Sequence, residues 1–275
     1  MGSKFFNPEH AALKDGKTLR LLKDIMAAVP VQYIYLHNHF LADKTAQEML
    51  IIVSFKHIRI LNELTPVLNI VFNGQIGLGY RVFHVHEVEQ ALLEGSLFFY
   101  YATAAQNCLF SRSGLFLDGG KPKLIADQVS ASYRHGIDRA NKFLTGATFY
   151  FKQQNFEYCT FMLHQVFDLM YRAIETLVMG KDKKTHRIKV HQTYIKPYVK
   201  PLSALFDHNE EEVNLLHLLD EAYLAVRYEN SYVIGEQDLL HLFEKADLLY
   251  VVAEQVYQRI MNNHFDQQRS TIDAG

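Results

Sequence analysis

Four polar residues between positions 164 and 175 are spaced so that they could form one site. His164, Asp168, Arg172 and Glu175 follow one another at steps of four, four and three residues, which places them on one face of a helix. Histidine exchanges protons near neutral pH, and arginine orients and neutralises a phosphate group. The same residues could instead form a buried polar network that ties helices together, with Asp168 paired to Arg227. The spacing leaves both interpretations open.

The helix that must position these residues is marked by its apolar pattern. Apolar residues recur at three- and four-residue steps, as on the buried face of a helix: Phe161, Leu163, Phe167, Met170, Tyr171, Ile174, Leu177 and Val178. Gly180 is suited to the left-handed conformation in which many helices end.

A basic segment, residues 181–189, follows this helix. It contains Lys181, Lys183, Lys184, Arg187 and Lys189 with Asp182 as the one acidic residue, and it includes Thr185-His186. The segment could form the rim of a phosphate site, or it could be a solvated run of charge.

The second half of the chain is helical throughout. Helical periodicity predicts four main helices, at about 126–151, 156–178, 213–226 and 239–260. Residues 194–206 contain Pro197 and Pro201, so a helix there should be short or kinked. Four helices with short connections predict an up-and-down four-helix bundle, in a domain spanning residues 123–265.

The first half alternates between helices and strands. We expect helices at 19–29, 58–72 and within 87–106, and strands at 32–36, 48–53, 80–86 and 108–110. These elements make a small α/β domain over residues 1–117. Turn-forming residues at 113–114 and 118–122 separate it from the bundle. The predicted fold class is therefore α+β with two domains.

Histidines in the first half are candidates for a metal site. His84 and His86 lie two residues apart in an expected strand, so both side chains should point to one face. With His37 or His39 they could ligate a metal ion. Exposed strand histidines are the commoner explanation, and the sequence offers no clear third ligand. We therefore predict no metal and no cofactor.

A glycine-rich stretch in the first half could be taken for a phosphate-binding loop. Gly74, Gly77 and Gly79 precede an expected strand instead of opening a helix. No helix N-terminus would receive the phosphate there. A plain loop is the better interpretation.

The composition excludes several classes of protein. Hydrophobic residues make up 49% and charged residues 21%, which is typical of a packed globular chain. A net charge of -2 gives no general attraction to nucleic acid or to an acidic membrane. No apolar run reaches the roughly 20 residues of a membrane helix. The N-terminal residues lack the apolar segment of a signal peptide. With two widely separated cysteines, Cys108 and Cys159, we expect a cytoplasmic protein without disulfides.

The motifs of the second half resemble the HEPN domain (higher eukaryotes and prokaryotes nucleotide-binding). The residues that carry the resemblance are Leu163, His164, Gln165, Asp168 (where the family usually has Glu), Tyr171, Ala173, Thr185, His186, Ala222, Tyr223, Arg227 and Tyr228. The resemblance implies a helical bundle that dimerises through its helices and binds a nucleotide or another phosphate ligand.

Many HEPN domains are ribonucleases that use an arginine followed, after four to six residues, by a histidine. Here Tyr232 occupies the first permitted histidine position after Arg227, and the next histidine, His241, lies too far along the chain. Tyrosine is a poor general base at pH 7, so we predict no catalytic residues. The candidate ligand-binding residues are His164, Gln165, Asp168, Arg172, Lys184, Thr185, His186, Arg227, Tyr228 and Tyr232.

The turn after the first strand resembles the core of the minimal nucleotidyltransferases. That family has Gly-Ser after the first strand and Asp-x-Asp on the second, where the aspartates bind Mg²⁺. Asn38 and His39 stand at the Gly-Ser positions here, and Glu48 and Leu50 stand at the aspartates. One carboxylate cannot rebuild the metal site. The resemblance implies a degenerate member without transferase activity.

The sequence is consistent with three functions. The leading hypothesis is a non-catalytic protein that binds a nucleotide or another phosphate ligand, with a regulatory role and a homodimer formed through the bundle. The second is a HEPN-type ribonuclease with an altered site, which would make RNA a partner. The third is a protein–protein interaction module.

Overall fold

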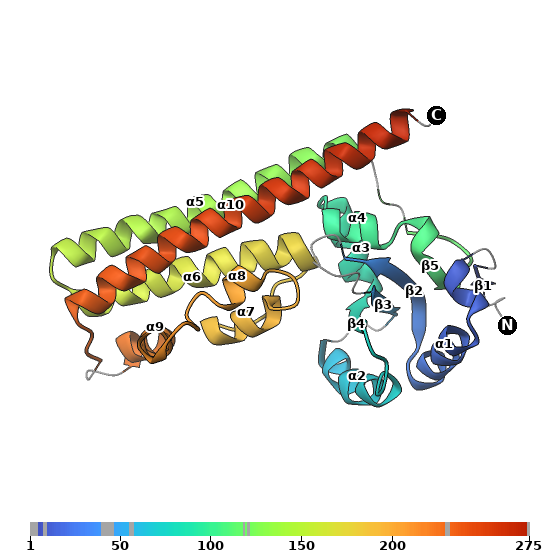
Figure 1. Cartoon of the computed structure of the whole chain (residues 1–275), viewed down its shortest axis with the longest axis horizontal. Coiled ribbons are helices and arrows are strands. Elements are labelled where there is room, and N and C mark those ends of the chain that lie inside the picture. The colour runs from blue at the N-terminus through green and yellow to red at the C-terminus, as the bar shows by residue number, and fades with distance from the viewer. Residues whose placement is uncertain are drawn as a thin grey trace. The chain divides into compact units, whose positions relative to one another are not determined.

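The computed structural model describes residues 5–7, 10–39, 47–54, 58–117, 119, 122–228 and 232–273. Internal contacts divide the chain into two units, residues 1–125 and residues 126–275. The first unit contains a β-sheet with helices, and the second contains helices throughout (Figure 1). The mixed α+β class predicted from the sequence is confirmed.

Five strands form the sheet of the first unit. They are β1 (Phe5–Phe6), β2 (Val31–Asn38), β3 (Gln47–Val53), β4 (Leu78–His84) and β5 (Cys108–Ser111), in the spatial order β1-β5-β2-β3-β4. β3 and β4 pair in parallel, and the other described pairs are antiparallel. The crossover between β3 and β4 is made by a helix, as parallel neighbours require.

Helices cover both faces of this sheet. The helices of the first unit are η1 (Ala11–Lys14), α1 (Gly16–Ala28), α2 (Ile58–Val71), α3 (Val85–Leu93), α4 (Leu97–Ala102) and η2 (Ala105–Asn107). Side chains of α1 and α2 pack with Ile34 and Ile51 on one face. Side chains of α3 and α4 pack with Tyr35 and Ile52 on the other. Successive residues of each strand thus enter opposite cores, which is why both interior strands are apolar throughout.

The predicted strand at 80–86 ends earlier than expected. β4 stops at His84, and His86 lies in the first turn of α3. The backbone N–H of His84 donates to the Glu87 carboxylate, 3.1 Å away, so this sequence starts a helix. The prediction that His84 and His86 share a strand face is therefore wrong; their rings stack, with centroids 5.4 Å apart. In the described part of the chain, no three His, Cys, Asp or Glu side chains come together as a metal site.

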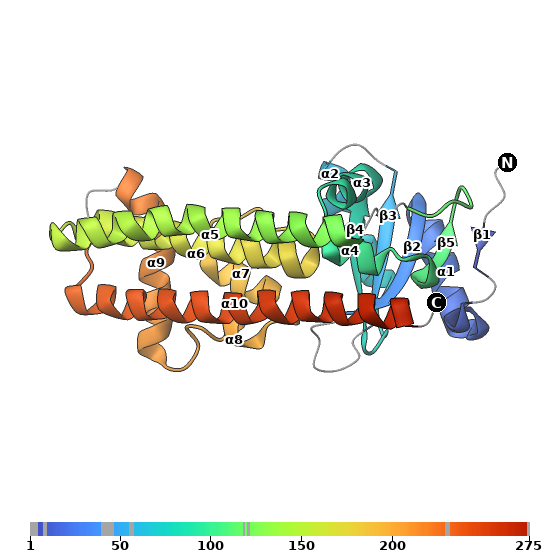
Figure 2. The ribbon, with the colours of Figure 1, turned by 90° about the horizontal axis from the view of Figure 1, so that it is seen from above.

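The second unit consists of four long and two short helices among its described residues. They are α5 (Pro122–Lys152), α6 (Phe156–Met179), α7 (Ile188–Ile195), α8 (Lys200–Ser203), α9 (Glu210–Tyr228) and α10 (Glu236–Asp273). α5, α6 and α10 run side by side, whereas α9 crosses them at a steep angle (Figures 1 and 2). The short helix α8 lies in the region 194–206 that was expected to be interrupted by Pro197 and Pro201, whereas α7 mostly precedes that region and was not predicted.

α6 is the central helix of this unit, and its ends follow from its sequence. The side chain of Asn155 accepts a hydrogen bond from Tyr158 N at the start, and Gly180 adopts a left-handed conformation (φ 71°) at the end. α6 is buried along most of its length and contacts α7, α9 and α10. A polar face on such a helix must therefore find its partners inside the protein. No helix in the ranges described is both long and apolar enough to cross a membrane.

Candidate functional site

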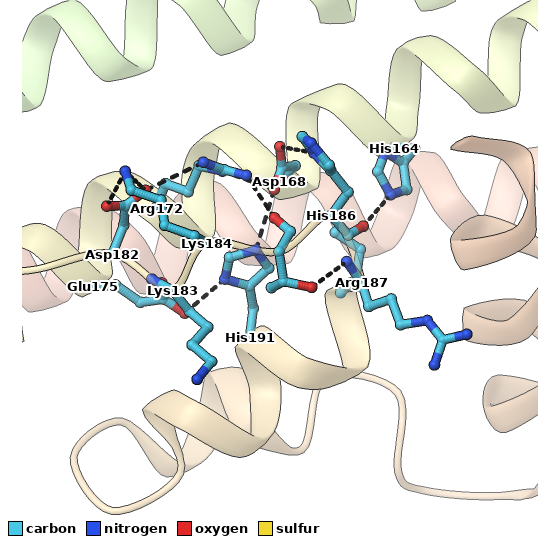
Figure 3. Close-up of polar contacts among 12 residues, drawn as sticks. His164, Asp168, Arg172, Glu175, Asp182, Lys183, Lys184, His186, Arg187 and His191 are labelled. Atoms are coloured by element: carbon cyan, nitrogen blue, oxygen red, sulfur yellow. Dashed lines mark hydrogen bonds and ion pairs between the residues drawn. The ribbon is translucent and has the colours of Figure 1, made fainter. Parts of the chain in front are cut away.

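The polar face of α6 lies mostly inside the helical unit. His164 and Glu175 are fully buried, Asp168 is 4% exposed, and Arg172 is partly exposed. Figure 3 shows these side chains directed towards the basic segment and towards α7. The four residues predicted from spacing alone are therefore brought together, and each contacts residues from outside α6.

Asp168 is the centre of this network. Its Oδ1 accepts hydrogen bonds from Arg172 Nε at 2.9 Å and His191 Nε2 at 3.1 Å, and its Oδ2 accepts one from His186 Nδ1 at 3.2 Å. Burial alone would raise the pKa of Asp168, but the hydrogen bonds from His191 and Arg172 lower that pKa to about 2. The carboxylate is therefore ionised at neutral pH and acts only as an acceptor.

His191, on α7, lies between two carboxylates. Its Nδ1 is 2.7 Å from Glu175 Oε1, and its Nε2 contacts Asp168. Burial alone would lower the pKa of His191, but hydrogen bonds to Asp168 and Glu175 raise it to about 9. Burial also raises the pKa of Glu175. Because both ring nitrogens face carboxylate oxygens, the ring is an imidazolium that donates on both sides.

Arg172 fixes the basic segment to α6. Its guanidinium donates to Asp182 Oδ2 at 3.2 Å and to the backbone oxygen of Thr185 at 2.5 Å, in addition to Asp168. Asp182 also accepts from Lys184 Nζ at 2.8 Å. Arg172 was predicted to contact a ligand, and in this structure its three described contacts are all internal.

His164 is held in its neutral form. Its Nε2 donates to the backbone oxygen of His186 at 2.7 Å, and its Nδ1 accepts from the side-chain amide of Gln165 at 3.1 Å. These roles follow from the partners, because a carbonyl oxygen only accepts. Burial lowers the pKa of His164 to about 4. His164 and Gln165 thus position the backbone beneath the surface residue His186.

His186 and Arg187 present the network to solvent. The His186 side chain is 47% exposed, and its ring stacks on Tyr223 of α9 with centroids 4.2 Å apart and planes 18° from parallel. Arg187 points away from the network (Figure 3). Among the residues that the structure describes, none forms a hydrogen bond with the Arg187 guanidinium, and the positive charge of Arg187 acts against the rise that burial causes in the pKa of Asp220. His186 and Arg187, with Tyr223 behind them, make the exposed part of the site.

The N-terminus of α7 already holds a carboxylate. Asp220 of α9 accepts hydrogen bonds from Ile188 N at 2.5 Å and Lys189 N at 3.4 Å. Burial raises the pKa of Asp220, while these two backbone donors oppose the rise. An external anion would therefore have to bind beside this helix end, next to Arg187, and not on it.

Three further candidates from the sequence lie on or after α9. Arg227 and Tyr228 belong to α9, but their side chains fall outside the described residues. The expected pairing of Asp168 with Arg227 is therefore not described; the described partners of Asp168 are Arg172, His186 and His191. Tyr232 is 6% exposed, and its hydroxyl donates to the backbone oxygen of Leu218 at 2.9 Å.

His191 and Asp220 were missed by the sequence reasoning. One signal could have found His191. Ile188, His191, Gln192 and Ile195 recur at three- and four-residue steps and are all buried on α7, so a helix beginning at Ile188 would have placed a histidine on a buried face. Asp220 is joined to α7 across 32 residues, and no local pattern indicates that contact.

The first unit contains a smaller polar cluster where the transferase site was considered. Glu48 Oε1 accepts from Arg81 Nε at 2.7 Å, and Glu48 Oε2 lies 3.4 Å from His37 Nε2. Leu50, at the second aspartate position, is fully buried in the apolar core. Glu48 is therefore already paired with a guanidinium, and the second aspartate position holds an apolar residue.

Comparison with known proteins bears on the second unit. No curated protein matches the chain. Residues 133–256, which hold all of α6 to α9 and most of α5 and α10, match the family profile of the HEPN domain.

Proposed function

We propose that the helical unit is a non-catalytic module that binds a nucleotide or another phosphate ligand at His186 and Arg187. The match to the HEPN domain supports this class of function, because such domains are often ribonucleases or nucleotide-binding modules. The proposal assigns the binding surface to the exposed side of the basic segment, between α6 and α7.

One observation carries the proposal. His186 is fixed in orientation by Asp168 and by the Tyr223 ring, and Arg187 beside it has no described hydrogen-bond partner. The nearby carboxylates of Asp168 and Asp220 are turned inward to internal donors. An anion at this surface would meet a guanidinium and an oriented imidazole, with no exposed carboxylate of this network opposing it.

The non-catalytic part of the proposal rests on the residues after Arg227. The position where the ribonuclease motif has histidine is Tyr232, and burial raises the pKa of its hydroxyl further above the ordinary value. A hydroxyl of this kind is unsuited to accept a proton at neutral pH. The ribonuclease alternative would need a different base.

The remaining parts of the proposal concern architecture. We propose that residues 1–117 are a degenerate nucleotidyltransferase-like domain, supported by the mixed sheet and by the pairing of Glu48 with Arg81. Residues 123–265 would form a HEPN-type four-helix bundle and dimerise through it, which the family match supports.

The test uses three ligands with the whole chain: AMP, ATP and the dinucleoside monophosphate ApA. Isothermal titration calorimetry should detect binding of at least one of them, and binding should raise the thermal unfolding midpoint. Arg187→Ala should weaken that binding about tenfold or more, because a charge-assisted hydrogen bond contributes about 1.5–3 kcal/mol. Arg139→Ala, which removes an exposed arginine from α5, is the matched control and should leave the affinity unchanged.

Two outcomes would contradict the proposal. If none of the three ligands binds, an interaction module becomes the better explanation. If binding is unchanged in Arg187→Ala, the ligand lies elsewhere. Cleavage of RNA that disappears in Arg227→Ala would instead support the ribonuclease alternative.

A further inference from the structure

We infer that the phosphate ligand binds His186 in its imidazolium form, so that ligand binding is coupled to protonation of this side chain. The inference rests on the proposed function, since it concerns the same surface. It follows from the way in which Asp168 uses one of the two ring nitrogens.

The Nδ1 nitrogen of His186 is already used in a hydrogen bond with Asp168. His186 Nδ1 lies 3.2 Å from Asp168 Oδ2. Asp168 is buried and also accepts hydrogen bonds from Arg172 and His191. It therefore remains a carboxylate and can only accept. The hydrogen between the two residues therefore belongs to His186 Nδ1.

The other ring nitrogen of His186, Nε2, is the one left to contact a ligand. A neutral imidazole carries one N–H, so with Nδ1 as the donor Nε2 has only a lone pair. No described residue is hydrogen-bonded to His186 Nε2. A phosphate oxygen is also an acceptor, and its contact with this lone pair would be repulsive. Donation from Nε2 to a phosphate requires a second proton on the ring.

The alternative tautomer is unfavourable here. Moving the single hydrogen to Nε2 would set the Nδ1 lone pair against the Asp168 carboxylate. A 180° turn of the ring would keep its plane stacked on Tyr223, but it would place Cδ2 instead of Nδ1 beside Asp168 and lose that hydrogen bond. The backbone oxygen of His186 is also held by His164. The surroundings thus fix both the position of the ring and the nitrogen that carries the hydrogen.

Charged groups of both signs lie around His186. The negative groups are Asp168 and Glu175 on α6, Asp182 in the basic segment and Asp220 on α9. The positive groups are Arg172 on α6, His191 on α7, and the cations of the basic segment, which are Lys181, Lys183, Lys184, Arg187 and Lys189. His164 is neutral, and the Arg227 side chain lies outside the described residues. An arriving anion adds negative charge next to the ring, which favours a proton on His186 in the bound state.

The experiment measures proton uptake with the ligand among AMP, ATP and ApA that binds most tightly. Calorimetric titrations at pH 7.5 in two buffers of different ionisation enthalpy give the number of protons taken up. Wild type should take up more protons per ligand than His186→Gln, by at most one. The difference between the two numbers excludes protons that the ligand itself takes up. His186→Gln keeps an amide donor, so its affinity should vary less with pH. His208→Gln removes another exposed histidine, paired with Glu212, and should behave as wild type.

A second measurement avoids dependence on the variant. In ¹⁵N spectra of the wild-type histidine rings, ligand should move the His186 signals towards those of a doubly protonated ring. Equal proton uptake in wild type and His186→Gln, or a bound His186 ring with one hydrogen, would overturn the inference while leaving the proposed function in place. Failure of all three ligands to bind wild type would remove both.

Discussion

His191 donates a hydrogen bond through Nδ1 to Glu175, 2.7 Å away, where neither side chain is exposed to solvent. On its other side the same ring contacts Asp168. A positive charge is thereby held inside the protein between two negative ones, and it joins α7 to α6. Removing one partner from a set of buried ion pairs leaves an uncompensated charge, which is strongly destabilising.

This arrangement predicts that stability decreases at alkaline pH. The pKa of His191 is about 9 in the folded protein against an ordinary value of 6.5. Its contribution to stability is therefore fully present below pH 6.5 and is lost as pH rises through about 9. A shift of this size corresponds to about 3 kcal/mol. Urea unfolding between pH 6 and pH 9.5 measures this loss.

The matched variant for this measurement is His191→Gln, which cannot carry a proton. Its free energy of unfolding should be lower than that of wild type at pH 6.5, and the difference should shrink towards pH 9.5. A constant difference across that range would show that His191 does not change its charge there. Other groups that titrate at high pH, such as the two cysteines, are common to both proteins.

Removing the charge of Asp168 should destabilise the helical unit without changing its shape greatly. Asp168→Asn keeps the size of the side chain but cannot accept from Arg172, His191 and His186 as a carboxylate does. We expect a loss of about 3–5 kcal/mol in the free energy of unfolding. Asp207→Asn is the control, because that carboxylate forms an exposed pair with Lys189 and should contribute less than about 1 kcal/mol. Equal losses in the two variants would contradict the central role of Asp168.

Two glycines of α5 should respond in opposite ways to alanine. A Cβ at Gly136 would lie 3.0 Å from Ala173 Cβ, whereas a Cβ at Gly146 would lie 3.3 Å from the flexible side chain of Met162. Alanine favours a helix over glycine by about 1 kcal/mol. We expect Gly146→Ala to be neutral or stabilising, and Gly136→Ala to lose about 1–3 kcal/mol through overpacking. Adding Ala173→Gly should restore stability to the Gly136→Ala protein but not to the Gly146→Ala protein. Thermal unfolding of five proteins checks this: wild type, the two single glycine variants and the two double variants.

Magnesium should not stabilise the first unit. Glu48 accepts from Arg81 at 2.7 Å, and the neighbouring aspartate position is Leu50. With no second carboxylate there, Mg²⁺ at 5 mM should leave the thermal unfolding midpoint within about 1 °C of its metal-free value. The double variant Arg81→Ala with Leu50→Asp supplies the missing carboxylate and removes the guanidinium from Glu48. Stabilisation of wild type by Mg²⁺ would contradict the degenerate assignment.

The sequence predicted α6 well because its apolar residues and its polar residues both recur at helical steps. Its apolar residues mark the buried face, and Gly180 marks its end. The polar face was predicted from the same spacing, since residues three and four apart are neighbours on any helix. Spacing could not show which partners these residues choose, because His191 reaches Asp168 across 23 residues of sequence.

The errors have physical causes as well. His86 was placed in a strand because residues 80–86 alternate, but alternation cannot show where a helix start competes for the same backbone. β1 was missed because a strand of two residues, Phe5–Phe6, contains no period at all; it exists through its pairing with β5. Both depend on contacts that a local pattern does not contain.

The connection between α6 and α7 has a consequence for related sequences. Its backbone is attached at successive points: Lys183 and Thr185 to side chains of α6, and Ile188 to α9. A substitution at an outward-facing position leaves these attachments intact, whereas one inserted or deleted residue would displace every attachment beyond it. We therefore expect homologues to differ freely in the solvent-facing residues of this connection while keeping its length constant.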